Sequence, residues 1–323
     1  MKVLFVFGTR PEIIKCYPVY QELKLKKHEV CLYYTNQNFD PTLSDLIFKE
    51  YPYDLLDYTR DQKKIDYVLV QGDTWSVLEG ALIAGKLKVK LGHIEAGIRS
   101  YDQRMIEEHI RIMVDGYSDF HFVPTEIAKN NIRAELGVKS YLVGNTIYDL
   151  MKDEKRGKPK FITVTLHRPE TVDVRETLKN TLDGITLVSS YYNLPIKFFV
   201  HPRTKDKLKT FGISPSFSAI DPVERSEFME CMKNSRLVIT DSGGVQEEAA
   251  ILKIPCVTAR ISTERPETIE ARLNILGGNV VGSIFDASRL IVTEVERGNF
   301  SSKPLYGDGH AGKNIVNILE NNL

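Results

Sequence analysis

The sequence predicts an α/β protein made of two doubly wound domains, each a parallel sheet covered by helices on both faces. Three observations indicate this fold. Short apolar runs without alternation recur along the chain, as in strands buried on both faces, and helix-like stretches separate them. The series then starts again after a charged linker. The chain has 323 residues, enough for two domains that each bury a core.

The first domain is expected over residues 1–151. Its strands are predicted in the apolar runs KVLFVFG, EVCLYYT, YVLVQGD, KLGHIEA, FHFVPT and SYLVGN. The segment KDEKRGKPK, which is charged and contains Gly and Pro, is typical of a linker. The second domain is expected over residues 152–305, with strands in FITVTLH, IKFFVHP, RLVITDSGG and PCVTAR. Helices are predicted between these runs, for example in VQEEAAILK.

Charge and cysteine content exclude several classes of protein. Lys plus Arg and Asp plus Glu number 43 each, so no net charge favours nucleic acid or an anionic membrane. No stretch reaches the roughly eighteen apolar residues of a membrane span, and the first run is too short for a signal peptide. We therefore expect a cytoplasmic protein with neither nucleic acid nor membrane as partner. The widely spaced cysteines argue against a zinc cluster or a disulfide framework: Cys16, Cys31, Cys231 and Cys256.

Glycines and polar residues gather directly after the predicted strands. In a doubly wound sheet, ligands bind beyond the carboxyl ends of the strands. Two such sheets with chemistry at the same ends predict two Rossmann-like domains that face a shared ligand cleft. The residues concerned are Gly8-Thr9-Arg10, Gln71-Gly72-Asp73, Glu95, His167, His201-Pro202-Arg203 and Asp241-Ser242-Gly243-Gly244.

The turn Asp241-Ser242-Gly243-Gly244 joins a strand to a predicted helix. Glycines let the backbone approach a ligand, and the helix N-terminus offers N–H groups, so this turn could bind phosphate. The alternative is an ordinary turn in which Asp241 or Ser242 caps the helix. Glu248 lies about one turn into the helix, where it could accept two ribose hydroxyls or simply favour the helix N-terminus.

The first turn, Gly8-Thr9-Arg10-Pro11-Glu12, has the same strand-to-helix form. Pro11 suits the first position of a helix, and Arg10 and Lys15 add positive charge. Opposite a second glycine turn, this segment could hold a diphosphate. Taken alone, it could equally be a well-capped helix start.

Acid–base candidates also lie at the predicted strand ends. Asp73 and Glu95 end short apolar strands, Glu107 begins a helix, and His167 ends the strand FITVTLH. Such carboxylates can serve as general acids or bases, and a histidine titrates near neutral pH. The alternative for any one of them is a solvated loop carboxylate or a structural histidine. The occurrence of four such groups at equivalent positions favours catalysis.

The motifs that carry these residues resemble those of a known family. The chain contains GTRPEIIK, QGDT, HIEAGIRS, FVPTE, VGNTIYD, HRPET, HPR, TDSGGVQEEA, TERPET and YGDGHAGKNI. They stand in the order found in non-hydrolysing UDP-N-acetylglucosamine 2-epimerases, and the chain resembles archaeal-type members over almost its whole length. The resemblance implies a GT-B-like fold of two Rossmann domains, with a C-terminal helix (306–323) that packs back toward the first domain.

The resemblance also implies a reaction and a set of ligands. The family interconverts UDP-N-acetylglucosamine and UDP-N-acetylmannosamine by eliminating UDP to form a 2-acetamidoglucal and adding it back. We therefore expect a UDP-sugar substrate, no nicotinamide cofactor, no metal, and a homodimer. The motif positions imply these roles: Arg10 and Lys15 on the UDP side; Asp73, Glu95 and Glu107 near C2 and the anomeric carbon; His167 at the diphosphate or sugar; His201 at the substrate; Ser242, Gly243 and Gly244 at phosphate; Glu248 at the ribose; Arg265 at phosphate or a hinge; and Phe228 near uracil.

The chain departs from the family pattern in several places. Where family members have Pro-Glu-Glu-x-Asn-Arg, residues 106–111 read Ile-Glu-Glu-His-Ile-Arg. Arg225 replaces a usual Tyr, and Thr171 replaces an Asn. The segment between Tyr34 and Tyr67 is shorter than usual, and Asn38 replaces a His that helps bind an activating UDP-N-acetylglucosamine in bacterial members. We therefore expect little activation by that sugar.

Three other functions stay open. The first is C2 epimerisation of a different UDP-2-acetamido sugar, such as a diacetamido uronic acid. The second is a GT-B glycosyltransferase, which would need an acceptor site. The third is a nucleotide-sugar-binding protein without turnover, which the shortened segment favours and the retained acid–base candidates oppose.

Overall fold

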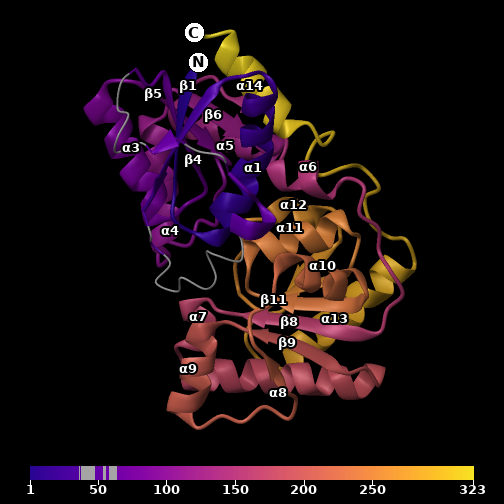
Figure 1. The fold of residues 1–323 in the computed structure, drawn as a ribbon. Helices are drawn as coiled ribbons and strands as arrows, with labels where there is room; N and C mark the ends of the chain where they lie inside the picture. The colour runs from indigo at the N-terminus through magenta and orange to yellow at the C-terminus, as the bar shows by residue number, and fades with distance from the viewer. Residues whose placement is uncertain (36, 38–47, 54–55, 58–63) are drawn as a thin grey trace. The chain divides into compact units, whose positions relative to one another are not determined.

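The computed structural model describes residues 1–35, 37, 48–53, 56–57 and 64–323. Contacts divide the chain into two units, one of Met1–Lys152 with Tyr306–Leu323 and the other of Asp153–Leu305. Each unit is a parallel sheet with helices on both faces (Figure 1), so the predicted pair of doubly wound domains is confirmed. Asn38 and much of the shortened segment lie outside the described residues.

The first unit contains a seven-stranded sheet in the order β3-β2-β1-β4-β5-β6-β7. Its described pairings are all parallel. The chain runs outward from β1 to β3 and then returns to place β4 beside β1, so the direction of winding reverses between β1 and β4. Ligands of such sheets bind at this reversal. The strands are β1 (Lys2–Phe7), β2 (Glu29–Tyr34), β3 (Leu56–Asp57), β4 (Tyr67–Gln71), β5 (Lys90–Ile94), β6 (Phe120–Val123) and β7 (Tyr141–Leu142).

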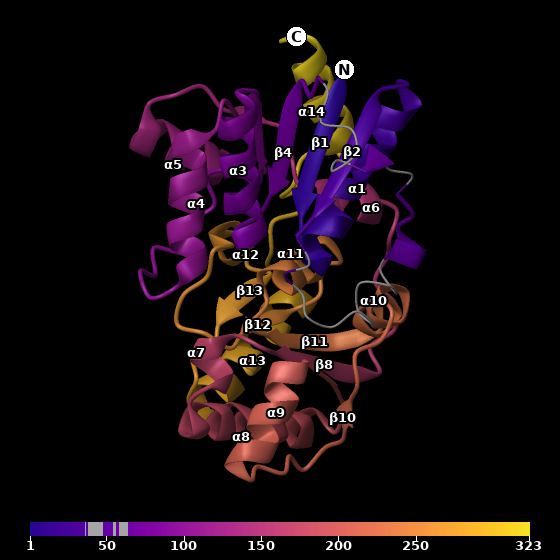
Figure 2. The same ribbon diagram turned by 60° about the vertical axis from the view of Figure 1, so that its left-hand side comes forward.

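Helices cover both faces of this sheet (Figure 2). One face carries α3 (Trp75–Leu87), α4 (Ile106–Tyr117) and α5 (Glu126–Leu136), and the other carries α1 (Arg10–Leu25), α6 (Thr146–Met151) and α14 (Ala311–Glu320). The last helix packs closely on α1: a Cβ added to Gly312 would lie 2.7 Å from the backbone of Pro18. Lys26, the residue that follows α1, forms an ion pair of 2.6 Å with Glu320 at the end of α14. The C-terminal segment therefore belongs to the first unit.

The second unit repeats the design with a six-stranded sheet in the order β10-β9-β8-β11-β12-β13. Winding reverses between β8 and β11, the equivalents of β1 and β4. Consecutive residues of both strands are fully buried, among them Ile162 and Thr163 on β8 and Val238 and Ile239 on β11, because helices cover both faces. The strands are β8 (Phe161–Leu166), β9 (Ile196–Val200), β10 (Ala219–Ile220), β11 (Ser235–Thr240), β12 (Cys256–Thr258) and β13 (Asn274–Leu276).

The helices of the second unit form two layers around this sheet. α8 and α13 pack against each other on one face, and the short helices α10, α11 and α12 lie on the other (Figure 2). The helices are α7 (Pro169–Val172), α8 (Arg175–Tyr192), α9 (Pro202–Phe211), α10 (Arg225–Lys233), α11 (Gly243–Ile251), α12 (Pro266–Glu270) and α13 (Val281–Glu296). Within the described part of the chain, no helix is both long and apolar enough to cross a membrane.

Candidate active site

Glu95 lies just beyond β5 in the first unit, with its backbone in the left-handed region (φ 69°). Residues with a Cβ rarely adopt this conformation, and it often occurs at functional sites. The carboxylate accepts hydrogen bonds from Lys15 Nζ at 2.5 Å and from Gln71 Nε2 at 2.9 Å. Lys15 and Glu95 are each 5% exposed. Lys15, expected on the UDP side, thus forms a buried ion pair with one of the predicted catalytic carboxylates.

Asp73 follows β4 and forms an ion pair with Arg111 of α4. Arg111 also lies 2.6 Å from the Glu108 carboxylate, and both residues are at most 1% exposed. Burial alone would raise the pKa of Glu108, but Arg111 and the N–H groups and hydroxyl around it outweigh burial and bring that pKa below its ordinary value. Glu107, the predicted catalytic neighbour, is only half-buried.

No role was predicted for Arg111 from the sequence. The motif could have indicated one, because residues three and four apart on a helix lie on the same side. Arg111 stands four residues after Glu107 and three after Glu108. In the structure it joins the loop after β4 to α4, and so it orients Asp73.

Glu12 occupies the start of α1. Its carboxylate accepts the backbone N–H groups of Gly8 and Thr9 at 2.7 and 2.8 Å, and the hydroxyl of Thr74 also donates to it. The first glycine turn is therefore a capped helix start whose N–H groups already have an acceptor. Arg10, the first residue of α1, is half-buried.

The buried Glu12 carboxyl predicts a pH-dependent stability. Burial raises the pKa of Glu12 from 4.5 to about 7. Because the folded state binds this proton more tightly than the unfolded state, the stabilisation is complete below pH 4.5 and is lost as pH rises through 7. Between about pH 5 and pH 8, wild-type protein should lose about 2–3 kcal/mol of unfolding free energy relative to Glu12→Gln. Urea unfolding of both proteins across this range measures the difference, and a constant difference would contradict the prediction.

In the second unit, His167 and Asp241 flank the reversal between β8 and β11. Asp241 is fully buried, and its carboxylate accepts the backbone N–H of His167 at 2.9 Å and lies 3.2 Å from Nδ1 of the His167 ring. His201, after β9, has its ring centroid 5.4 Å from that of His167. Burial, and secondly the nearby His167, lower the pKa of His201 to about 4, so His201 is neutral near pH 7. The structure thus brings both predicted histidines together.

The turn Ser242-Gly243-Gly244 begins α11. Ser242 is at the N-cap position, but its side chain makes no capping hydrogen bond. A Cβ on Gly243 would lie 2.2 Å from Oε1 of Glu264, so any other residue there would displace this carboxylate. A Cβ on Gly244 would meet no atom within 4 Å, so the backbone there borders open space. This geometry suits an anion that approaches the first turn of α11.

Glu248, the predicted ribose ligand, is paired with Arg225 of α10. Arg225 Nη2 donates to Glu248 Oε1 at 2.7 Å, and both residues are 8% exposed. The arginine that replaces the usual Tyr therefore orients this carboxylate. Phe228 lies on the same helix and packs edge-on against Phe199, with ring centroids 5.1 Å apart.

Arg265, expected at phosphate or a hinge, precedes α12 and is held inside the second unit. Its Nε lies 2.6 Å from Oε1 of Glu247, and both side chains are buried. The adjacent Glu264 accepts a hydrogen bond from Arg260 Nη1 at 2.8 Å. Arg265 thus contributes to a charged network around the start of α11.

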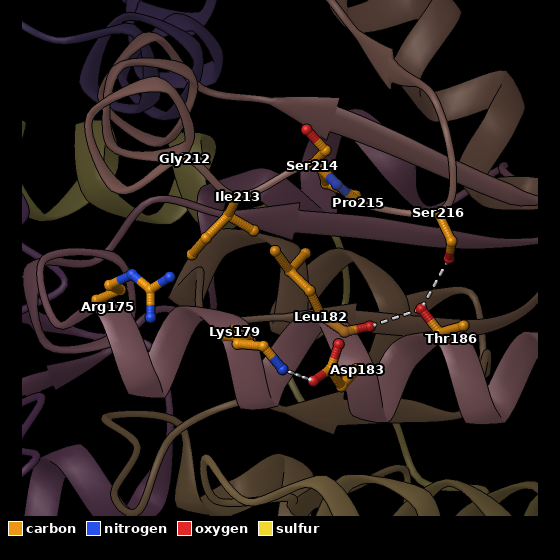
Figure 3. Close-up of a pocket in the computed structure, with 10 residues that line it drawn as sticks. All are labelled: Arg175, Lys179, Leu182, Asp183, Thr186, Gly212, Ile213, Ser214, Pro215 and Ser216. Carbon is orange, nitrogen blue, oxygen red and sulfur yellow. Dashed lines mark hydrogen bonds and ion pairs between the residues drawn. The ribbon is translucent and has the colours of Figure 1, made fainter.

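A separate pocket of about 300 Å³ lies between α8 and the segment 212–216 (Figure 3). Two of its charged residues, Lys179 and Asp183, form an ion pair of 2.6 Å along α8. None of the predicted site residues lines this pocket. The chemistry at the strand ends, rather than this pocket, therefore defines the candidate active site.

Comparison with protein families gives a match to the family described as UDP-N-acetylglucosamine 2-epimerase, over residues 21–320. The UDP-N-acetylglucosamine 2-epimerase of Methanococcus maripaludis is 40% identical over 365 aligned positions, which cover 98% of each chain. That alignment is longer than the 323 residues of this chain, so it contains gaps on this side. The predicted short segment between Tyr34 and Tyr67 would account for gaps of this kind.

Two further comparisons concern a solved structure and a relative with another substrate. The crystal structure of the Methanocaldococcus jannaschii UDP-GlcNAc 2-epimerase in complex with UDP-GlcNAc and UDP has a TM-score of 0.90 at 38% identity. It covers 99% of this chain and 100% of that one. The UDP-2,3-diacetamido-2,3-dideoxy-D-glucuronate 2-epimerase of Pseudomonas aeruginosa is 32% identical over 99% of both chains.

Proposed function

Because this chain belongs to the UDP-N-acetylglucosamine 2-epimerase family, we propose that it interconverts UDP-N-acetylglucosamine and UDP-N-acetylmannosamine. The family predicted from the motifs is confirmed. The observation that supports the reaction is that each unit carries a different kind of reactive group at the ends of its strands. Carboxylates lie beyond the ends of β4 and β5 in the first unit, and a glycine turn suited to phosphate follows β11 in the second.

The proposed reaction proceeds by elimination. No ketone adjoins C2 of the sugar, so direct removal of its proton would leave an unstabilised carbanion. If the C1–O bond to UDP breaks as the C2–H bond breaks, the electron pair of C–H forms a C1=C2 double bond, and a 2-acetamidoglucal and UDP result. Return of UDP to C1 and of a proton to the other face of C2 completes the epimerisation.

Each unit has a proposed part in this reaction. In the second unit, Ser242 and the N–H groups of Gly243 and Gly244 stabilise the departing diphosphate, which gains negative charge. His167 and His201 contact the same group, Arg265 supports it, Phe228 lies toward uracil, and Glu248 binds the ribose. In the first unit, Asp73, Glu95 and Glu107 move the C2 proton and stabilise positive charge at C1. Arg10 lies toward UDP, whereas Lys15 orients Glu95.

Proton NMR in heavy water tests the function directly. Purified protein with UDP-N-acetylglucosamine, without added NAD and with EDTA, should produce UDP-N-acetylmannosamine with deuterium at C2. Trace glucal and free UDP would support elimination. Epimerisation without deuterium entry would exclude this mechanism, and a requirement for NAD or metal would exclude the cofactor-free chemistry. Binding without any turnover would favour the non-catalytic alternative.

The UDP-linked diacetamido uronic acid for which the Pseudomonas relative is named should be tested in the same way. The two sugars differ at C3 and C6, so one UDP site could serve either. Comparison of kcat/KM for both UDP-sugars decides between them. Higher kcat/KM for the uronic acid would reassign the substrate but keep the reaction.

Glu248→Ala is expected to weaken UDP binding by roughly 1–3 kcal/mol, because two ribose hydroxyls lose a charged acceptor. Calorimetry with UDP and with 2′-deoxy-UDP gives the sharper test. Wild type should prefer UDP, and Glu248→Ala should lose most of that preference. Glu227→Ala removes an exposed carboxylate from the same unit and should keep the preference. A preference retained in Glu248→Ala would contradict the ribose role.

We also propose that the protein is a cytoplasmic homodimer. All four cysteines are free, which suits a reducing compartment. An apolar surface on α3 and α4 could form the dimer contact. Trp75 and Leu82 are 55% and 68% exposed on α3, and Met113 and Tyr117 are 47% and 55% exposed on α4. The hydroxyl of Tyr117 lies against Gly85 of α3, so α3 and α4 meet beside these exposed residues.

The dimer prediction is tested with charge at this surface. Leu82→Glu and Met113→Glu should shift the protein from dimer to monomer, because a dimer contact would bury the added carboxylate without a partner. Light scattering coupled to size exclusion measures the mass. Leu290→Glu, at a residue 52% exposed on α13 of the other unit, is the control and should stay dimeric. A monomeric wild type would refute the proposal.

A further inference from the structure

A fully buried histidine, His93, connects segments of the first unit that carry the catalytic candidates. It lies on β5 with no exposed surface. Its Nδ1 is 2.7 Å from Oδ1 of Asp115, and its Nε2 is 2.8 Å from the carbonyl oxygen of Gly72. Both ring nitrogens therefore face an oxygen at hydrogen-bonding distance.

The partners determine how many protons this ring carries. The Gly72 carbonyl can only accept a hydrogen bond. The other oxygen of Asp115 lies 2.8 Å from Nη1 of Arg99 and accepts the N–H of Gly97 at 3.0 Å. The Arg99 guanidinium and the Gly97 N–H thus stabilise Asp115 as a carboxylate, which has no hydrogen to donate to Nδ1 of His93. A neutral imidazole has one N–H, so it would leave one of its two contacts without a hydrogen. Both contacts are satisfied only when both nitrogens are protonated.

The surrounding charges balance such an imidazolium. Arg99 binds Glu135 through Nη2 at 2.7 Å, in addition to Asp115. His121, the partner of His93 on β6, donates from Nε2 to the Asp115 backbone carbonyl at 2.7 Å. Burial lowers the pKa of His121, so this second histidine is neutral. The cluster then holds two cations, His93 and Arg99, beside two anions, Asp115 and Glu135.

The contacts of this cluster end beside the predicted catalytic residues. Gly72, which accepts from His93, directly precedes Asp73 and has a φ of 90°, a backbone conformation that favours glycine. Gly97, which donates to Asp115, follows Glu95 by two residues. Asp115 itself is on α4, the helix that also carries Glu107 and Arg111. One histidine–aspartate pair thus joins all three segments.

We propose that His93, held as a doubly protonated imidazolium by Asp115 and Gly72, is a positioning residue that fixes the Asp73 turn relative to Glu95 and α4. The kinetic part of this inference rests on the proposed epimerase function. Loss of the contact to Gly72 would remove one link between the Asp73 turn and α4 and leave the Arg111–Asp73 ion pair as the other. A misplacement of about 1 Å at a catalytic group can lower the rate on the order of a hundredfold.

NMR of histidine labelled with nitrogen-15 tests the protonation state of the wild-type protein without a substitution. At about pH 8, an exposed imidazole with an ordinary pKa near 6.5 is mostly neutral. The buried ring of His93 should instead show a proton on each nitrogen, and both protons should exchange slowly with water. His93→Gln should remove that pair of signals, and His121→Gln should keep it. A neutral ring at position 93 would overturn the imidazolium.

Kinetics test the positioning role, with His121→Gln as matched control. Both histidines are buried neighbours that contact Asp115, but only His93 binds Gly72. His93→Gln should lower kcat by about tenfold to a hundredfold with little change in KM or in UDP affinity. His121→Gln should change kcat less than about threefold, although this variant also loses one buried hydrogen bond and the stability that the bond contributes. Equal losses of kcat in both variants, or none in His93→Gln, would refute the role.

The two proposals fail in distinguishable ways. A wild-type protein that binds UDP but converts no UDP-sugar would contradict the epimerase function. The NMR signals of His93 would still decide its protonation state in that case. Should His93→Gln fail to fold, Asp115→Asn removes the anion from the other side, and it should abolish the pair of N–H signals and lower kcat. Retention of both N–H signals in folded Asp115→Asn would overturn the inference.

Discussion

Glu107→Gln and Glu108→Gln should give opposite results, although the two residues are adjacent. Glu107 is half-buried and proposed to act on the sugar, so its amide variant should lower kcat on the order of a hundredfold or more. Its free energy of unfolding should change little. Glu108 is fully buried against Arg111, so its amide variant should mainly lose stability. Steady-state kinetics and urea unfolding of both variants measure this contrast.

Asp73→Asn and Glu95→Gln should lower kcat by a similar factor, but with a cost in stability. Glu95→Gln removes the carboxylate that is paired with the buried Lys15. Asp73→Asn removes one of the two carboxylates that are paired with Arg111, which keeps Glu108, so its cost should be the smaller of the two. The double variant Lys15→Met with Glu95→Gln removes both charges and should recover stability without recovering kcat. Near-normal activity in Glu107→Gln would mean that the altered motif has moved this role to another residue. Recovery of kcat in the double variant would show that Glu95 has a structural role and not a catalytic one.

Most of the fold could be predicted because strands buried on both faces leave a clear apolar pattern. β1, β4 and β11 each contain an unalternated apolar run, and in β8 threonines stand between the apolar residues; the structure has a strand in each of the four. The strands β3, β10 and β13 were not predicted. They are two or three residues long, and pairing with the neighbouring strand of the sheet, rather than a pattern in their own residues, defines them.

The site could be predicted only in part. The position of a residue after a strand shows where it lies in the fold, but it does not show which side chain it contacts. Position after a strand was enough to single out Asp73, Glu95 and Asp241. The ion pairs that orient the carboxylates depend on side chains that meet only in the folded unit. Lys15 reaches Glu95 across 80 positions of sequence, and Arg225 reaches Glu248 across 23. A polar residue on a buried strand was the one signal for His93, and a structural role accounts for such a residue equally well.

Arg111→Met is expected to lower the free energy of unfolding by about 3–5 kcal/mol, because it leaves the fully buried Glu108 carboxylate without its cation. Asp73 loses its ion pair in the same variant, so kcat should also fall. Urea unfolding measures the first effect, and steady-state kinetics measures the second. Arg111→Lys should rescue neither fully, since one ammonium cannot reproduce the planar guanidinium that bonds Asp73 and Glu108 at once.

The double variant Arg111→Met with Glu108→Gln separates the two effects. An amide at position 108 can still accept the N–H groups of Ser100 and Tyr101 through its oxygen, while the uncompensated charge disappears. Much of the lost stability should therefore return, whereas kcat should stay low because Asp73 still has no guanidinium to orient it. Full recovery of kcat in this double variant would show that Arg111 matters to turnover only through folding. No recovery of stability would show that the arginine side chain stabilises α4 by packing rather than by charge.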